Sequence, residues 1–168
     1  MELTRERALL YLRQMMQIRK FEDKIMELLA RNIAEGGSHL YAGMEAVAVG
    51  AINAIRPEDK ITSTHRGHGH AIVKDGDLNA LMAEILGKKT GVCKGKGGSL
   101  HLADVSKGNL GANGVVGGSI AIATGAALSC KMQNNGRIVI CFFGDGATNQ
   151  GIFYESMNIA ALWKLPVL

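Results

Sequence analysis

A short apolar segment followed by a glycine-flanked aspartate constrains this chain more than any other feature. Residues 137–143 read Arg-Ile-Val-Ile-Cys-Phe-Phe, without the polar–apolar alternation of a half-exposed strand. Such a run is typical of a strand buried on both faces, as in a parallel sheet. Gly144-Asp145-Gly146 interrupts the run, and Thr148 or Asn149 can begin a helix after it. Strand, glycine turn, helix and a further apolar segment predict a βαβ unit, and therefore an α/β protein with helices around a parallel sheet.

Helical spacing of apolar residues predicts several further elements. A long helix after Thr4, ended by Gly36-Gly37, carries apolar residues three and four apart on one face: Tyr11, Met15, Ile18, Phe21, Ile25 and Leu28. Other helices are expected after Gly43, around residues 78–86 and over 120–130. A short strand over 60–64 delivers residues 65–70 into a loop. The helix after Gly146 is expected to turn five residues inward: Phe153, Met157, Ile159, Ala160 and Trp163.

A glycine-rich segment separates these helices from the apolar strand. Nine of the 28 residues over 91–118 are glycine. Loops of this length are uncommon in compact domains and are usually functional or disordered. Because the flanking elements are strongly apolar, we expect an ordered, functional loop.

Composition excludes several classes of protein. With 168 residues, 47% of them hydrophobic and 20% charged, the chain has the length of one domain and is not a disordered polypeptide. Its apolar runs are far shorter than the roughly 20 residues of a membrane span, and its charged start does not resemble a secretory signal. Three cysteines do not make a disulfide framework, so we expect a cytoplasmic location. A net charge of +4 is too small to argue for nucleic acid.

The last residues read as the opening of another buried strand. Pro166 follows a helix end, and Val167-Leu168 is apolar. A strand of two or three residues cannot complete its hydrogen bonds. We therefore expect residues 1–168 to be the N-terminal part of a single longer domain, with a sheet that is incomplete at the C-terminus. A short frayed tail is the alternative.

The Gly144-Asp145-Gly146 turn has the chemistry of a diphosphate site. A glycine turn between a buried strand and a helix is where open α/β sheets bind phosphates. A carboxylate there repels a diphosphate unless a cation lies between them, and Mg²⁺ commonly joins a carboxylate to substrate phosphates. The turn thus points to a diphosphate with a metal, although a turn that only closes a loop has the same three residues.

Two other segments carry charge or titratable groups. Arg66 suits a phosphate oxygen, since its planar fork bonds in a bidentate manner. The neighbouring histidines over 65–70 show no spacing for a tetrahedral zinc site, and a solvated loop is the plain alternative. The lysine-rich segment over 88–96 lacks the order of a Walker motif. It could attract an anionic ligand or carrier, or it could simply be solvated.

Five blocks together resemble one family across nearly the whole chain. They occur in that family's order at residues 39–46, 61–69, 94–101, 113–117 and 144–147. The family comprises the alpha subunits of the thiamine-diphosphate-dependent dehydrogenases of 2-oxo acid and acetoin dehydrogenase complexes. The His65-Arg66 pair is most similar to the acetoin branch. Met44 departs from the family, which commonly has Gln there, and we expect this to change only a packing neighbour.

The resemblance implies residue roles and cofactors. It implies thiamine diphosphate and Mg²⁺, with Asp145 as a metal ligand and Gly146 and Ala147 on the diphosphate. The other cofactor-binding positions it implies are His39, His65, Arg66, Gly114 and Val116. His68 and His101 lie in matching loops and are carried as catalytic candidates. The family's distal Asn-Asn pair would follow Leu168, since Asn134-Asn135 precedes the aspartate.

The same resemblance implies partners and a reaction. It implies a small-molecule substrate (acetoin, pyruvate or another 2-oxo acid), a beta subunit in a heterotetramer, and a lipoyl-bearing acyltransferase that receives the acyl group. No nucleic acid and no membrane are expected. There are two alternatives: a transketolase-like or decarboxylase relative, and a basic glycine-rich module that binds nucleic acid. The nucleic-acid-binding module would need more aromatic residues than the 5% that this chain contains.

Overall fold

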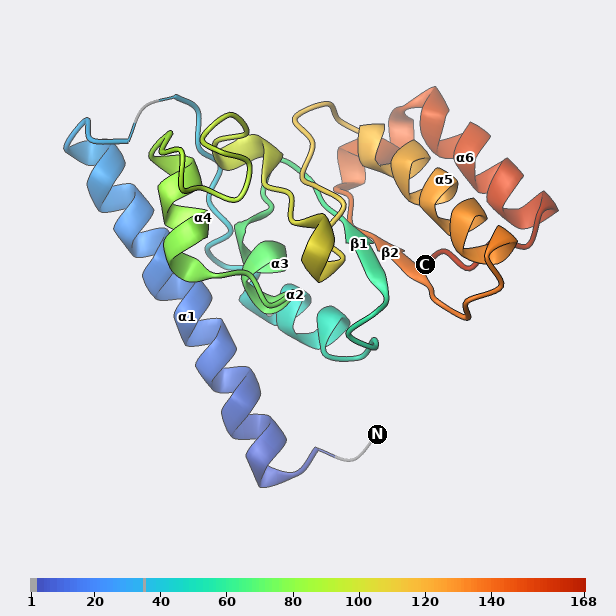
Figure 1. The fold of residues 1–168 in the computed structure, drawn as a ribbon, viewed down its shortest axis with the longest axis horizontal. Coiled ribbons are helices and arrows are strands. Elements are labelled where there is room, and N and C mark those ends of the chain that lie inside the picture. The colour runs from blue at the N-terminus through green and yellow to red at the C-terminus, as the bar shows by residue number, and fades with distance from the viewer. Residues whose placement is uncertain (1–2, 35) are drawn as a thin grey trace.

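Helices flank a small parallel sheet in the computed structural model, which describes residues 3–34 and 36–168. Helices α1 to α4 lie on one side of strands β1 and β2, and α5 and α6 on the other (Figure 1). The elements in chain order are α1 (Arg5–Ala30), α2 (Glu45–Ile52), β1 (Lys60–Thr62), α3 (His68–Val73), α4 (Leu78–Ile85), α5 (Gly118–Met132), β2 (Val139–Cys141) and α6 (Gly151–Leu162). The expected α/β class is confirmed. In the described part of the chain, no helix has the length and apolarity to cross a membrane.

The sheet has the predicted parallel arrangement. Lys60 pairs with Val139, and Thr62 pairs with Cys141. Val167 forms a parallel bridge to Val139. Val139 and Ile140 are buried, as their apolar run predicts. Both strands are shorter than expected, since residues 63–64, 137–138 and 142–143 lie outside them.

The long helix α1 supplies most of one core. Its predicted apolar face is confirmed, since Ile18, Phe21 and Ile25 are buried against residues of α2, α3 and α4. The Thr4 side chain caps the helix by accepting a hydrogen bond from the Arg7 backbone. The helix ends at Ala30 rather than at Gly36-Gly37, because the chain turns at Asn32, whose φ is +53°.

Helices α5 and α6 form a second core with β2. Small residues of α5, including Ala123 and Ala127, pack with Val139 and Leu165. The predicted start of α6 is wrong, and its predicted inward face is only partly correct, since Phe153 and Ala160 are partly buried. The helix begins at Gly151, since residues 145–149 form a separate 3₁₀ turn. The side chains of Met157 and Trp163 are 53% and 46% exposed.

The reason for this difference lies in side-chain size. Ser156 is the buried residue of α6, and Ala160 packs against the α5 core. Small side chains let the two helix backbones approach closely, so the larger apolar residues remain on the outer surface. Phe153 is partly buried, with its ring centroid 5.6 Å from that of Phe143.

The glycine-rich segment is ordered, as expected. It contains 3₁₀ turns at Ser99–His101 and Val105–Lys107, and Asn109 bridges to both Ile61 and Asp104. The histidine segment is more regular than expected, because α3 begins at His68. Gly69 lets this helix approach Tyr41: a Cβ atom at Gly69 would lie 2.4 Å from Tyr41 Cδ1.

Candidate cofactor site

A cavity of about 450 Å³ lies at the carboxyl ends of β1 and β2. This is the end of a parallel sheet at which α/β proteins bind ligands. The segment after β1 contributes Thr64, His65 and Arg66, and the segment after β2 contributes residues 142–147. The segments before α2 and α5 complete the wall with Tyr41, Met44, Asn113, Val115, Val116 and Gly117.

The turn after β2 presents Asp145 and Gly146 at the cavity surface. Both are exposed, and Ala147 is buried beneath them. Residues 145–149 form a 3₁₀ turn, and the first N–H groups of such a turn have no partner within it. Thr148 Oγ1 donates a hydrogen bond to the Asp145 carbonyl at 2.6 Å. The turn therefore offers backbone donors and one carboxylate to an anion–cation pair.

Arg66 faces the same cavity from the loop after β1. Its guanidinium donates one hydrogen bond to the Leu40 carbonyl at 2.8 Å and is otherwise exposed. The carbonyl contact orients the guanidinium and leaves donors for a phosphate. Arg66 and Asp145, 79 residues apart in sequence, are thus brought to one cavity.

His39 and His65, both predicted to lie beside the cofactor, are in contact with each other. The ring centroids of His39 and His65 are 4.9 Å apart in an edge arrangement. His65 lines the cavity, whereas His39 does not line it and is exposed. Partial burial, with the nearby His39 and Arg66, lowers the pKa of His65 below its ordinary value. A neutral imidazole beside Arg66 avoids adding a second fixed charge.

Val116, Gly114 and His101 define the rim. Val116 lines the cavity, and Gly114 lies between the lining residues Asn113 and Val115. A Cβ atom at Gly114 would be 3.3 Å from His101 Nε2, so the imidazole packs against this backbone. His101 is exposed and does not line the cavity itself. The structure thus places His101 next to the site rather than inside it.

His68 lies apart from the cavity. Its side chain is 0% exposed and bridges Glu22 and Ser99: Nδ1 is 2.9 Å from Glu22 Oε1, and Nε2 is 2.8 Å from Ser99 Oγ. A fully enclosed side chain with both nitrogens engaged cannot contact a substrate in this arrangement. We therefore drop the expectation of a catalytic His68 and assign it the structural task of joining α1 to the segment that carries His101.

Sequence reasoning missed a hydrogen-bonded chain beneath the cavity. Ser63 Oγ lies 2.6 Å from His70 Nδ1, and Tyr41 Oη lies 3.0 Å from His70 Nε2. The His70 ring stacks on Phe142 with centroids 3.8 Å apart. Burial lowers the pKa of His70 to about 3, so the imidazole is neutral. In the sequence this network is only weakly indicated: Tyr41 lies close to His39, and His70 lies close to His65 and His68.

Met44 is a second residue whose position differs from expectation. It packs against the core of α1 to α4, as expected, but it also lines the cavity together with Val47. The replacement of an amide by a thioether makes this wall more apolar.

Metal-binding side chains are few at the site. Across residues 3–34 and 36–168, no three His, Cys, Asp or Glu side chains come together as a metal site. Asp145 is the carboxylate at the cavity, and a single carboxylate joined to phosphate oxygens is a common arrangement for Mg²⁺.

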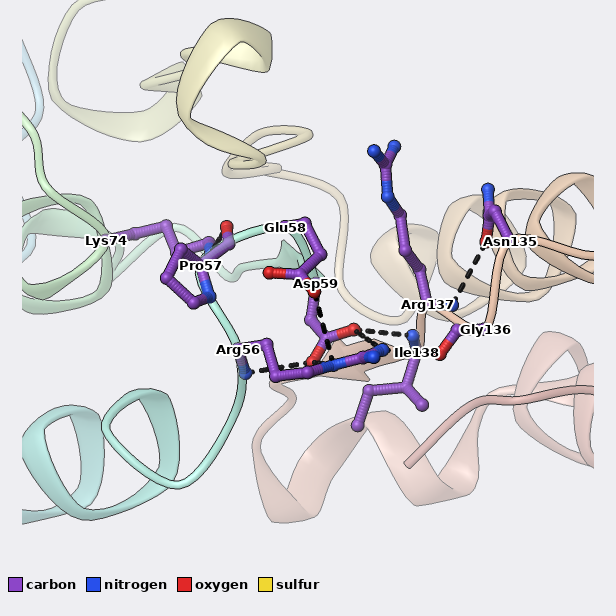
Figure 2. A network of polar contacts seen from close by, with 9 residues as sticks. All are labelled: Arg56, Pro57, Glu58, Asp59, Lys74, Asn135, Gly136, Arg137 and Ile138. Carbon is purple, nitrogen blue, oxygen red and sulfur yellow. Dashed lines mark hydrogen bonds and ion pairs between the residues drawn. The ribbon is translucent and has the colours of Figure 1, made fainter.

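A larger cavity, of about 620 Å³, lies near the opposite ends of the strands. Figure 2 shows the polar network beside it, where Asp59 accepts hydrogen bonds from the Arg56 side chain and the Ile138 backbone. Burial alone would raise the pKa of Asp59, but Arg56 and the backbone donors hold it below its ordinary value. These contacts tie the start of β1 to the start of β2, which is a structural role.

A glycine-flanked aspartate and an arginine thus meet at one cavity, at the end of a parallel sheet where α/β folds commonly bind phosphate-bearing ligands. Comparison with protein families gives the particular group: residues 13–168 match the family described as Dehydrogenase E1 component. The chain belongs to this family.

The relatives point to the same group. The alpha subunit of a Bacillus subtilis (strain 168) acetoin:2,6-dichlorophenolindophenol oxidoreductase is 56% identical over 168 residues, which are 100% of this chain and 50% of the relative. The protein of the same name from Cupriavidus necator is 50% identical over 166 residues, 99% of this chain and 50% of the relative. A Rhizobium meliloti pyruvate dehydrogenase E1 component subunit alpha is 41% identical over 167 residues, 99% of this chain and 48% of the relative. The chain spans about half the length of these curated relatives.

Proposed function

We propose that this chain provides the alpha-subunit half of a thiamine diphosphate site in a dehydrogenase that cleaves acetoin. The observation that carries the proposal is the meeting of Arg66 with Gly144-Asp145-Gly146 at one cavity. The identity of 56% to an acetoin oxidoreductase alpha subunit favours acetoin as the substrate.

The cavity fits a diphosphate cofactor in size, charge and position. Its volume of about 450 Å³ falls within the roughly 300–1,000 Å³ of small-molecule sites. Arg66 and the N–H groups at the start of the 145–149 turn would hold the diphosphate. Asp145 would hold Mg²⁺ against the phosphate oxygens. Without the cation, the carboxylate would repel the diphosphate.

The remaining residues would orient the organic part of the cofactor. Val116 and the backbone around Gly114 would hold the aminopyrimidine ring, while His65, supported by His39, would border the reacting end. His101 would stand at the rim. When bound, thiamine diphosphate supplies the carbanion chemistry that breaks the carbon–carbon bond beside a carbonyl. The protein's contribution is therefore binding, orientation and exclusion of water.

The proposal includes partners and location. The description of the relatives as alpha subunits implies a beta subunit. We propose a heterotetramer with each cofactor at an alpha–beta boundary, and a lipoyl-bearing carrier that accepts the acyl group as its disulfide is reduced. Residues 1–168 would be the N-terminal part of one domain. We also propose a cytoplasmic location.

A second candidate substrate is pyruvate or a branched-chain 2-oxo acid. The identity of 41% to a pyruvate dehydrogenase alpha subunit supports it. The family match gives no support to a nucleic-acid-binding module.

Dye reduction by the full-length chain with its beta partner tests the proposal. Acetoin, pyruvate and a branched-chain 2-oxo acid are supplied separately with thiamine diphosphate and Mg²⁺. We expect acetoin to give the highest kcat/KM. Preference for a 2-oxo acid would transfer the assignment to the second candidate, and cofactor-independent turnover would contradict the proposed cofactor.

A further inference from the structure

The lysine-rich segment after α4 is held in one conformation by a buried carboxylate. We call residues 88–98 the basic loop. Glu84, which is 0% exposed in the last turn of α4, accepts hydrogen bonds from four backbone N–H groups of this loop. The donors are Cys93 and Gly95 at 2.8 Å, Gly97 at 2.7 Å and Gly98 at 3.2 Å. The loop therefore folds around one negative charge.

Close backbone packing leaves the basic loop little freedom. A Cβ atom at Gly91 would lie 2.3 Å from Glu84 Oε2, and one at Gly97 would lie 2.6 Å from the His101 carbonyl oxygen. Gly95 has a φ of +77° and a similar approach to Gly87. Glycine is needed at these positions because no side chain fits, which explains the composition of the loop.

The lysines of the basic loop lie at the protein surface. Lys88, Lys89, Lys94 and Lys96 are all exposed. None of the four forms an ion pair with any residue in the described ranges. Glu84, four residues before Lys88, is enclosed and occupied by backbone donors. The outer face of the loop thus presents four positive charges on a preorganised backbone.

The basic loop adjoins the rim of the cofactor cavity. Cys93 Sγ lies 3.5 Å from the His101 carbonyl oxygen, and the His101 ring packs against Gly114 at the cavity wall. In Figure 1 the loop follows α4 on the side of the fold toward which β1 points. A partner on the loop would therefore stand next to the opening of the cavity.

We propose that the basic loop is a docking surface for an acidic protein face, that of the carrier domain which presents the acyl acceptor. This proposal rests on the proposed function. None of the four lysines lines the cofactor cavity or the larger cavity. Four exposed charges on a loop that lines neither cavity fit the face of an acidic protein better than a small anion enclosed in a pocket. A rigid loop also loses little conformational entropy on docking.

Charge-reversal variants of the full-length chain with its beta partner test this docking. The test pairs are Lys88→Glu/Lys89→Glu and Lys94→Glu/Lys96→Glu. The matched control, Arg13→Glu/Lys20→Glu, reverses two exposed charges on α1 that form no ion pair in the described ranges. Each variant is assayed with a reducible dye, which needs no carrier, and with an isolated lipoyl-bearing domain as acceptor.

We expect both test pairs to keep wild-type dye reduction. At low salt, their kcat/KM for the carrier domain should fall by about tenfold or more, which is the lower end of the range for electrostatic steering. The loss should shrink as salt rises from about 10 mM to about 1 M, because the Debye length falls from about 30 Å to about 3 Å. Lys88→Arg/Lys89→Arg should behave as wild type.

Two results would overturn the proposal. One is unchanged carrier kinetics in both test pairs at low salt, and the other is an equal loss in the α1 control. A wild-type complex without dye reduction would instead contradict the proposed function, so the two failures are distinguishable.

Discussion

Asp145 and Arg66 are the charged side chains on which the proposed diphosphate site depends. They reach the same cavity from the ends of neighbouring parallel strands. Their proposed roles differ: Asp145 would need a cation to tolerate the diphosphate, and Arg66 would bond the phosphate directly. Substitution should therefore separate a metal-dependent effect from a metal-independent one.

Asp145→Asn is expected to weaken Mg²⁺-dependent cofactor binding. Loss of even an outer partner of a metal typically lowers affinity by about 10–100-fold, so we expect at least about tenfold here. Titration calorimetry of thiamine diphosphate at several Mg²⁺ concentrations, with the full-length chain and its beta partner, measures the effect. Equal Mg²⁺ dependence in variant and wild type would count against a metal at Asp145.

Arg66→Lys is expected to weaken cofactor binding at every Mg²⁺ concentration. A lysine keeps the charge but cannot bond a phosphate in a bidentate manner or retain the contact to Leu40. The same calorimetric titration applies, and the loss should be similar at low and high Mg²⁺. Full affinity in the lysine variant would show that Arg66 contacts no phosphate.

His70 is expected to remain neutral throughout the physiological range. Burial lowers its pKa in the folded state to about 3 from 6.5. Protonation therefore favours the unfolded chain, so this contribution to stability is complete above pH 6.5 and declines below it, by about 1.4 kcal/mol per pH unit. NMR titration of the His70 ring and the free energy of unfolding from pH 8 to 5 measure this, and a His70 pKa above 6 would contradict it.

At the residue scale, the sequence predicts charged groups better than buried networks. Arg66 and Asp145 were candidates because their chemistry is recognisable beside glycines, and both do line one cavity. The bonding of His68 to Glu22 could not, because it joins residues 46 positions apart through tertiary packing. The same holds for Tyr41 and His70.

The α4 helix and the basic loop behave as one element through Glu84. Burial alone would raise the pKa of Glu84, but the four backbone donors hold it below its ordinary value. Because the pKa is lower in the folded state, the stabilisation is present above the ordinary value of 4.5 and is lost as pH falls through the lower folded pKa.

Glu84→Gln is therefore expected to loosen the basic loop. The amide has one acceptor oxygen and no charge, and charge-assisted hydrogen bonds contribute about 1.5–3 kcal/mol. Hydrogen exchange should speed up at the amides of Cys93, Gly95, Gly97 and Gly98, while those of β2 remain protected. Unchanged protection of the loop would contradict its dependence on Glu84.

Gly69→Ala is expected to destabilise the packing of α3 against Tyr41. The new methyl group would lie 2.4 Å from Tyr41 Cδ1, so the ring or the helix must move. Overpacking of this kind costs about 1–3 kcal/mol in the free energy of unfolding. Chemical denaturation measures the cost, with Gly50→Ala, a position with open space, as the control. Similar stability of both variants would contradict this account.

At the element scale, periodicity predicts the existence and type of elements better than their faces and ends. The apolar stripe of α1 was correct because it consists of large residues. The predicted inward face of α6 was only partly correct because size alone does not say which face meets a neighbour: Ser156 and Ala160 fit against α5, and Trp163 does not.

The whole molecule leaves large apolar side chains uncovered around the proposed site. Val115, Val116 and Phe143 are exposed at or near the cavity, and Tyr154 and Leu162 are exposed along α6. Exposed apolar groups that gather in this way mark interaction surfaces. Under the proposed function, a beta subunit would cover the part of this surface that borders the cavity.

The central claim is that this cavity binds thiamine diphosphate. The most direct measurement is calorimetric titration of the cofactor with Mg²⁺ into the full-length chain assembled with its beta partner, for the wild type and for Arg66→Ala/Asp145→Asn. The account predicts saturable, Mg²⁺-dependent binding to the wild type, and binding weakened by about 100-fold or more in the double variant, the combined effect of a phosphate and a metal contact. Equal affinity in both proteins, or no binding to the wild type, would contradict it.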